Sequence, residues 1–124
     1  MSQAYVLLAH GSRRAASNDE VLVLAASLGE RLQAPVAAAF IEQTQPDLAS
    51  ACEPLLAAGA STIRVLPYLL AAGRHLAEDI PALVDQCQQQ WPHHHFTISD
   101  HVGGAPLMVE LLAGLASSPI NTDT

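Results

Sequence analysis

Two histidines and a glutamate follow three apolar runs of this chain, and their side chains suit a metal ion. His10 and Glu42 each come directly after such a run, and His75 lies in the loop after a third. Two neutral imidazoles and a carboxylate form an open site for Co²⁺, Fe²⁺, Ni²⁺ or Zn²⁺. No thiolate accompanies them, so the metal would not be held in a closed sulfur cage. We therefore take these three residues as candidate metal ligands.

Each of the three residues also has a structural interpretation. A lone histidine at a strand end, such as His10, is more often a hydrogen-bonded structural residue than a ligand. Glu42 could be a solvated loop charge, and His75 could cap the following helix turn. Their recurrence at successive strand ends is what favours a shared site.

Positive charge gathers beside the two histidines. Arg13, Arg14 and Arg74 are three of the five arginines in a chain that has no lysine and a formal charge of −7. Guanidinium groups pair with carboxylates in a fork geometry. The sequence therefore predicts an anionic ligand, rich in carboxylates or phosphates, at the same place. A nucleic-acid partner would call for a basic stripe, and none is visible.

Apolar runs and helical periodicities alternate along the chain, and these elements must position the candidate ligands. The runs at 5–9, 36–41, 63–69 and 96–98 are typical of buried parallel strands. Four strand–helix units predict an α/β fold, a four-stranded parallel sheet with helices on both faces. By analogy with flavodoxin-like folds we expect the strand order 2-1-3-4.

Ligands of such sheets bind beyond the carboxyl ends of the strands, where the candidate ligands stand. If the first and third strands are neighbours, about 4.8 Å apart, their loops bring the imidazoles of His10 and His75 to one spot.

Helix boundaries follow from capping residues and prolines. Ser17 and Glu20 have the spacing of a capping box, and Asp79 is a candidate cap of the third helix. Pro46 and Pro106 favour the first turns of the second and fourth helices. In the fourth helix the apolar spacing predicts an inward face formed by Met108, Leu111, Leu112 and Leu115.

Length and composition bound the class of protein. With 124 residues, 50% of them hydrophobic, we expect a single domain over 1–124, with a core from about 4 to 116 and a loose tail at 117–124. No apolar run approaches the roughly 20 residues of a membrane span. Cys52 and Cys87 fall on the expected core faces of helices, and a reduced cytoplasm suits them.

Three further features carry weaker signals. His93, His94 and His95 resemble a metal tract but precede the fourth strand, away from the predicted site, so we expect a solvated turn. His101 follows the fourth strand at the same sheet end and stays a minor candidate. Gly103 and its glycine neighbour could cradle an anion with backbone amides.

Four sequence blocks, in this order and spacing, resemble the sirohydrochlorin chelatases of the CbiX type. The blocks are LLAHGSR at 7–13, AFIE at 39–42 followed by Gln45 and Pro46, AAGA at 57–60, and GRHLAEDIP at 73–81. The resemblance runs from residue 4 to about residue 116, and the length is similar to that of the short form, a single half that pairs as a homodimer. One departure is visible, because Ala105 stands before Pro106 where the family often has a histidine.

The resemblance implies a chelatase-like fold and ATP-independent insertion of a divalent metal into a tetrapyrrole. His10 and His75 match the metal-binding and proton-accepting histidines, and Glu42 matches the acidic position that assists them. Insertion removes two pyrrole N–H protons, and imidazole, with a free pKa near 6.5, is a suitable base. Ser12 of the first block and the three arginines, Arg13, Arg14 and Arg74, are candidates for holding the substrate's peripheral carboxylates.

The same residues leave other functions open. A non-catalytic carrier of metal or tetrapyrrole would use the same His-Glu-His site. A histidine phosphatase would need an arginine just before its His-Gly pair, where this chain has Ala9. For the chelatase we expect a cytoplasmic homodimer, Co²⁺, Fe²⁺ or Ni²⁺ as substrate, no organic cofactor, and the pathway to cobalamin or sirohaem. The excess of apolar residues fits the pairing of two copies.

Overall fold

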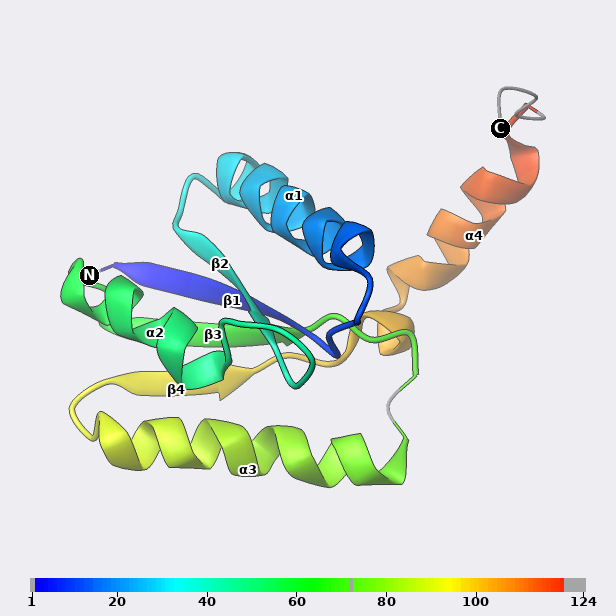
Figure 1. Cartoon of the computed structure of the whole chain (residues 1–124). Helices are drawn as coiled ribbons and strands as arrows, with labels where there is room; N and C mark the ends of the chain where they lie inside the picture. Colours follow the sequence, from blue (N-terminus) through cyan, green and yellow to red (C-terminus); the bar gives the residue numbers. More distant parts are fainter. Residues whose placement is uncertain (1, 72, 120–124) are drawn as a thin grey trace.

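The computed structural model describes residues 2–71 and 73–119, and for His75 the backbone alone. Strands and helices alternate along the chain (Figure 1). The elements are β1 (Gln3–Ala9), α1 (Ala15–Leu32), β2 (Val36–Phe40), α2 (Leu48–Ala57), β3 (Thr62–Pro67), α3 (Arg74–Gln90), β4 (His95–Ile98), the short 3₁₀ helix η1 (Val102–Gly104) and α4 (Leu107–Ser117). Residues 120–124 of the expected tail lie outside the described residues.

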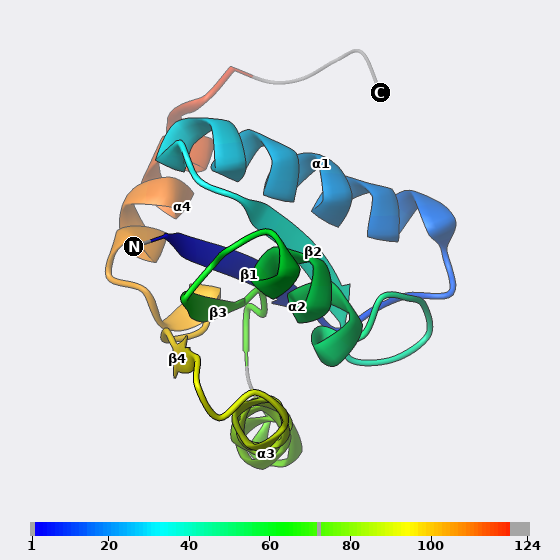
Figure 2. The same cartoon turned by 90° about the vertical axis from the view of Figure 1, so that its left-hand side faces the viewer.

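The four strands form one parallel sheet in the order β2-β1-β3-β4, which confirms the expected α/β fold and strand order. Seen from the end, α1 covers one face of the sheet, and α2 and α3 cover the other (Figure 2). β1 lies between β2 and β3, so the residues that follow it stand at the centre of the carboxyl edge of the sheet.

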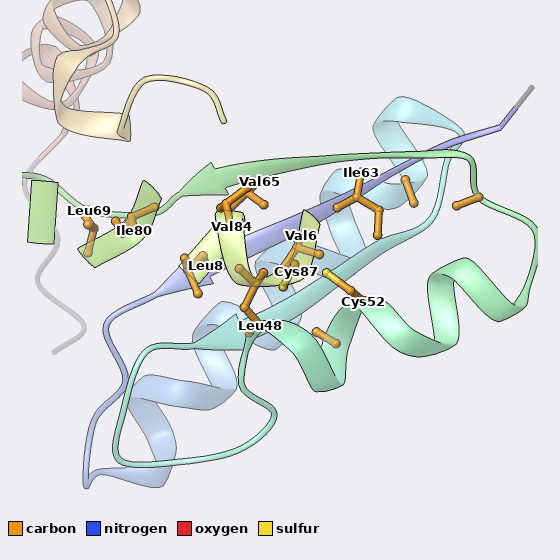
Figure 3. Close-up of a cluster of buried hydrophobic side chains, with 14 residues drawn as sticks. Val6, Leu8, Leu48, Cys52, Ile63, Val65, Leu69, Ile80, Val84 and Cys87 are labelled. Atoms are coloured by element: carbon orange, nitrogen blue, oxygen red, sulfur yellow. The ribbon is translucent and has the colours of Figure 1, made fainter. Parts of the chain in front are cut away.

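The larger part of the core lies between the sheet and the helices α2 and α3 (Figure 3). Val6 and Leu8 of β1 and Ile63 and Val65 of β3 are fully buried there. Leu7 of β1 points instead to the smaller cluster under α1. Because β1 is buried on both faces, its sequence is a continuous apolar run rather than an alternation.

The expected helix starts are partly wrong. α1 begins at Ala15 with Arg14 as its N-cap residue, so Ser17 and Glu20 lie inside the helix and form no capping box. α3 begins at Arg74 after Gly73, which places Asp79 inside the helix rather than at its cap. The N-cap of the third helix is therefore six residues earlier in the chain than the predicted cap.

The second helix has caps at both ends. Asp47 is the N-cap of α2, and its carboxylate accepts a hydrogen bond of 2.9 Å from the Ser50 amide. The hydrogen bonds from the Ser50 amide and side chain lower the pKa of Asp47 below its usual value. At the other end Gly59 follows the C-cap residue and has φ +112°, a left-handed conformation common for glycine just after a helix.

The fourth helix does not pack as expected. Leu111, Leu112 and Leu115 were predicted to face inward, yet they are 55%, 56% and 63% exposed. α4 extends past the carboxyl edge of the sheet, away from the other helices (Figure 1). An apolar stripe shows that a helix has a face to bury, but it does not say which surface covers that face.

The two cysteines belong to the core. Cys52 and Cys87 are free and buried, as predicted, and Figure 3 shows them in the same cluster. The neighbouring Cys87 thiol and burial both raise the pKa of the Cys52 thiol.

Within residues 2–71 and 73–119 no helix has the length and apolar character needed to cross a bilayer.

Candidate functional site

His10 and Glu42 meet at the carboxyl edge because the β1–β2 ladder continues past the ends of both strands. Ile41 donates its amide to the Ala9 carbonyl at 2.9 Å, and Glu42 donates its amide to the His10 carbonyl at 3.0 Å. The side chains then approach to 3.6 Å between His10 Nε2 and Glu42 Oε2. The parallel register of β1 and β2 therefore sets this pair.

Both side chains of the pair are open to solvent, with exposed fractions of 52% for His10 and 54% for Glu42. An exposed contact at this distance adds little to stability. It does leave an imidazole that can take up a proton or a metal ion next to a carboxylate that favours the resulting positive charge.

Gly11 allows this close approach of the two loops. It has φ +97°, a backbone conformation that side chains with a Cβ rarely adopt. A Cβ at this position would also overlap the carbonyl oxygen of Glu42. Glycine is thus required here by both the conformation and the space.

Asn18 holds the loop that carries His10, a role that was not predicted from the sequence. Its Oδ1 accepts the Ser12 amide at 3.0 Å, and its Nδ2 donates to the Ser12 carbonyl at 2.8 Å. The Ser12 hydroxyl in turn accepts the Arg14 amide at 3.0 Å. Ser12 is therefore occupied in shaping the loop, and Asn18 is a positioning residue. An asparagine in a first helical turn was the one available signal.

The three candidate arginines differ in their surroundings. Arg13 and Arg14 are exposed in the loop between β1 and α1, close to His10 in the sequence. Arg74 begins α3 and is 95% exposed, with Glu78 at 3.9 Å. At such exposure this contact is weak. All three guanidinium groups follow the carboxyl ends of strands and are accessible to an anion.

The predicted meeting of His10 and His75 involves a side chain outside the described residues. The backbone of His75 lies in the first turn of α3, not in a loop as expected. The strand that precedes α3 is β3, a direct neighbour of β1. Among the described side chains, no three His, Cys, Asp or Glu residues are grouped to hold a metal ion.

His101 lies at the same edge, near the start of α3. It lines a hollow of about 170 Å³ together with Leu76 and Ala77 of α3 and Ile98 of β4. His93 stands at the other end of β4, in the turn that precedes the strand, so the histidine tract is remote from this edge.

The glycine pair before α4 is not an anion cradle. Gly103 donates its amide to Leu69, and Gly104 donates its amide to the His101 carbonyl, both at 3.0 Å. A Cβ at Gly103 would overlap the Leu70 carbonyl. Gly103 is needed for close packing against the Leu70 backbone, and both glycine amides already have partners.

The parallel sheet, with a histidine–carboxylate pair and arginines at its carboxyl edge, is that of an α/β class of proteins whose ligands generally bind beyond this edge. The sequence profile of the CbiX family matches residues 4–118, and this chain belongs to that family.

Known proteins of similar sequence and structure agree with this assignment. The sirohydrochlorin cobaltochelatase of Sulfolobus acidocaldarius is 29% identical over 118 residues, which cover 95% of this chain and 93% of that protein. The crystal structure of a CbiX protein from Marinobacter aquaeolei superposes with a TM-score of 0.82 at 26% identity, covering 92% of this chain and 93% of that one.

Other relatives are longer. The sirohydrochlorin cobaltochelatase of Priestia megaterium is 24% identical over 110 residues, which cover 89% of this chain but 36% of that protein. The present chain thus spans about a third of that relative's length.

Proposed function

We propose that this protein inserts a divalent metal, Co²⁺ or Fe²⁺, into sirohydrochlorin without ATP. The observation that carries the proposal is the His10–Glu42 pair, 3.6 Å apart at the carboxyl edge of a CbiX-family sheet. The names of the relatives from Sulfolobus acidocaldarius and Priestia megaterium support the substrate and the reaction. Ni²⁺ accepts the same ligands, and the reaction needs no organic cofactor.

The chemistry follows from what insertion requires. The metal replaces two pyrrole N–H protons, so the site must present M²⁺ and accept protons at nearly the same point. The imidazole of His10 can do either, and the Glu42 carboxylate stabilises the positive charge that develops there. We assign the second imidazole to His75, whose helix follows the strand beside β1.

The arginines of the edge hold the substrate. Sirohydrochlorin carries many carboxylates, and Arg13, Arg14 and Arg74 are exposed to meet them. Ser12 supports this contact indirectly, because its hydroxyl orders the Arg14 backbone.

One copy of the chain offers an open edge, whereas the tetrapyrrole is wide. We therefore include in the proposal a pair of chains as the working form, located in the cytoplasm and serving cobalamin or sirohaem synthesis. The apolar side chains left exposed on α1 and α4 support such pairing.

Absorption spectroscopy tests the reaction. The protein is mixed with sirohydrochlorin and Co²⁺ or Fe²⁺, and the rate is compared with a protein-free control. We expect His10→Ala and His75→Ala each to abolish most of the activity, and Glu42→Gln to lower it less. His93→Ala, an exposed histidine at the opposite edge, is the matched control and should keep full activity. Full activity in both histidine variants, His10→Ala and His75→Ala, would refute the site. Binding of sirohydrochlorin without acceleration of metal insertion would indicate a carrier.

A further inference from the structure

Leu70 lies in the loop between β3 and α3, and its side chain stands in water. It is 76% exposed, the highest value among the large apolar side chains that the structure describes. Its neighbour Leu69 is only 8% exposed and belongs to the core under α2 and α3. A single exposed leucine is common on protein surfaces. What distinguishes Leu70 is its place at the carboxyl edge and the way in which its backbone is held.

The parallel register of β1 and β3 relates Leu70 to His10. Beyond the last paired residues, Tyr68 donates its amide to the Leu8 carbonyl at 2.7 Å. Two residues further along each segment stand His10, after Leu8, and Leu70, after Tyr68. Both residues therefore follow the carboxyl ends of neighbouring strands, equally far past this hydrogen bond. The exposed leucine belongs to the same edge as the His10–Glu42 pair.

Gly103 of η1 holds the backbone on either side of the Leu69–Leu70 peptide bond. It donates its amide to the Leu69 carbonyl at 3.0 Å. A Cβ on Gly103 would overlap the Leu70 carbonyl and would lie 2.9 Å from the Leu70 Cα. Gly103 is not among the described residues with positive φ, so its conformation would suit other residues as well. Glycine is needed there for space alone, and the Leu70 backbone fills that space.

An apolar side chain on a fixed backbone is well prepared for a ligand. Water covers the Leu70 side chain at the edge where ligands of parallel sheets bind, and removing that water is favourable. Because Leu69 is buried and Gly103 packs against the loop, a ligand that covers Leu70 spends little of its binding energy on ordering the chain.

The substrate of the proposed reaction has two chemical parts that a binding site must recognise. A tetrapyrrole is a planar macrocycle with apolar faces and, in sirohydrochlorin, a rim of carboxylates. Arg13, Arg14 and Arg74 are suited to the rim. The His10–Glu42 pair and the arginines are all polar, whereas small-molecule sites are lined mainly by apolar side chains. Leu70, four residues before Arg74 in the chain, offers the apolar contact that these residues do not provide.

We propose that Leu70 packs against a face of the sirohydrochlorin macrocycle and that Gly103 holds Leu70 in place for this contact. The inference rests on the proposed function and adds the residue that binds the apolar part of the substrate. Leu70 touches the macrocycle, and Gly103 is a positioning residue that acts through Leu70. Since the face is the same before and after the metal enters, the contact strengthens binding and leaves the rate of insertion unchanged.

Binding of metal-free sirohydrochlorin, measured by equilibrium dialysis and absorption, tests the contact. We expect Leu70→Ser to raise the dissociation constant roughly 10-fold, with a rate of metal insertion at saturating substrate within about twofold of the wild type. Leu70→Met keeps an apolar side chain of similar volume and should bind as the wild type does. Leu32→Ser is the matched control, because Leu32 is an exposed leucine at the end of α1, next to the opposite edge of the sheet.

Gly103→Ala tests the positioning role. The new methyl group displaces the Leu70 backbone, so the dissociation constant should rise about as much as in Leu70→Ser. Added to Leu70→Ser, the same substitution should cause little further rise, because the contact is already lost. Gly114→Ala on α4 is the matched control, since a Cβ there meets no atom within 4 Å. An equal rise in both backgrounds would overturn the action of Gly103 through Leu70.

The outcomes separate this inference from the proposed function. Wild-type affinity in Leu70→Ser overturns the contact, and metal insertion then stands on its own assay. Wild-type affinity together with a lower mass in sedimentation equilibrium would place Leu70 between two copies of the chain, which also overturns the contact. A wild type that binds sirohydrochlorin without accelerating insertion refutes the enzyme, and the same dissociation constants still decide the contact. A wild type that does not bind sirohydrochlorin refutes both.

Discussion

Substituting Gly11 with alanine tests whether the approach of the two loops holds the His10–Glu42 pair. Placing a Cβ on a left-handed residue costs about 1–2 kcal/mol. The new atom also overlaps the Glu42 carbonyl oxygen, which must withdraw by about 1.5 Å to reach normal contact. That movement strains the hydrogen bond from Glu42 to His10, and overpacking of this kind costs about 1–3 kcal/mol. Together these terms give a loss of about 2–5 kcal/mol.

Gly59→Ala is the matched control for this prediction. Gly59 has φ +112°, so it shares the conformational cost, but a Cβ there would meet no atom within 4 Å. Its expected loss is therefore about 1–2 kcal/mol. For a chain of this size each kcal/mol lowers the melting temperature by about 3–5 °C. Thermal unfolding followed by circular dichroism should separate the two variants.

The same variants should differ in metal insertion. A misplacement of about 1 Å can slow a reaction by about 100-fold, so the larger shift of Glu42 should slow metal insertion by about that factor or more. Gly59 is remote from the carboxyl edge, and its variant should keep its rate. If Gly11→Ala unfolds at the same temperature as Gly59→Ala and inserts metal at the wild-type rate, the close approach of the loops does not hold the pair.

Three further substitutions test the framework. Asn18→Ala removes both hydrogen bonds to the Ser12 backbone, so we expect slower metal insertion and a loss of about 1–3 kcal/mol in urea unfolding, with Asn18→Asp losing only the donated bond. Asp47→Ala removes the cap of α2 and should cost about 1 kcal/mol at pH 7. The pKa of Asp47 is lower in the folded protein than in the unfolded chain, where it is about 3.9. The stabilisation by this cap is therefore complete at pH values above about 3.9 and is lost as the pH falls through the folded pKa. Urea unfolding curves measured at neutral pH and at acidic pH check this loss. Ile63→Ala should cost about 2–5 kcal/mol, since Ile63 is fully buried, and an unchanged urea midpoint would contradict its place in the core.

The fold could be predicted from the sequence because β1 is buried on both faces and its neighbours β2 and β3 are also largely apolar. Continuous apolar runs alternating with helical spacing leave little choice other than a parallel sheet, and short connections favour neighbouring strands. The strand order came from analogy, since the residues alone do not distinguish it. Cys52 and Cys87 were placed correctly because their spacing matches buried helix faces.

The first residues of the helices were harder to predict, because several polar residues near each start are equally suitable as N-caps. Ser17 and Glu20 had the right spacing for a cap, but the loop before α1 is stabilised instead by Asn18 and Ser12. Such a side-chain contact to a backbone six positions away depends on the folded loop. Sequence spacing alone does not encode it.

At the site, the sequence identified residue types but not distances. His10 and Glu42 follow neighbouring strands, and the register of β1 and β2 determines that their side chains approach to 3.6 Å. The role of Gly11 could not be predicted, because it depends on the Glu42 carbonyl, which is close in space but far along the chain. The participation of His75 stays a prediction.

The exposure of α4 has a consequence for how the protein responds to its own concentration. The helix has 11 residues, and isolated helices shorter than about 12–15 residues are marginal in water. Its order must therefore come from whatever covers Leu111 and its neighbours. If another molecule of the same chain provides that cover, dilution unravels this segment while the sheet stays folded, and its amide protons exchange faster in dilute samples than in concentrated ones.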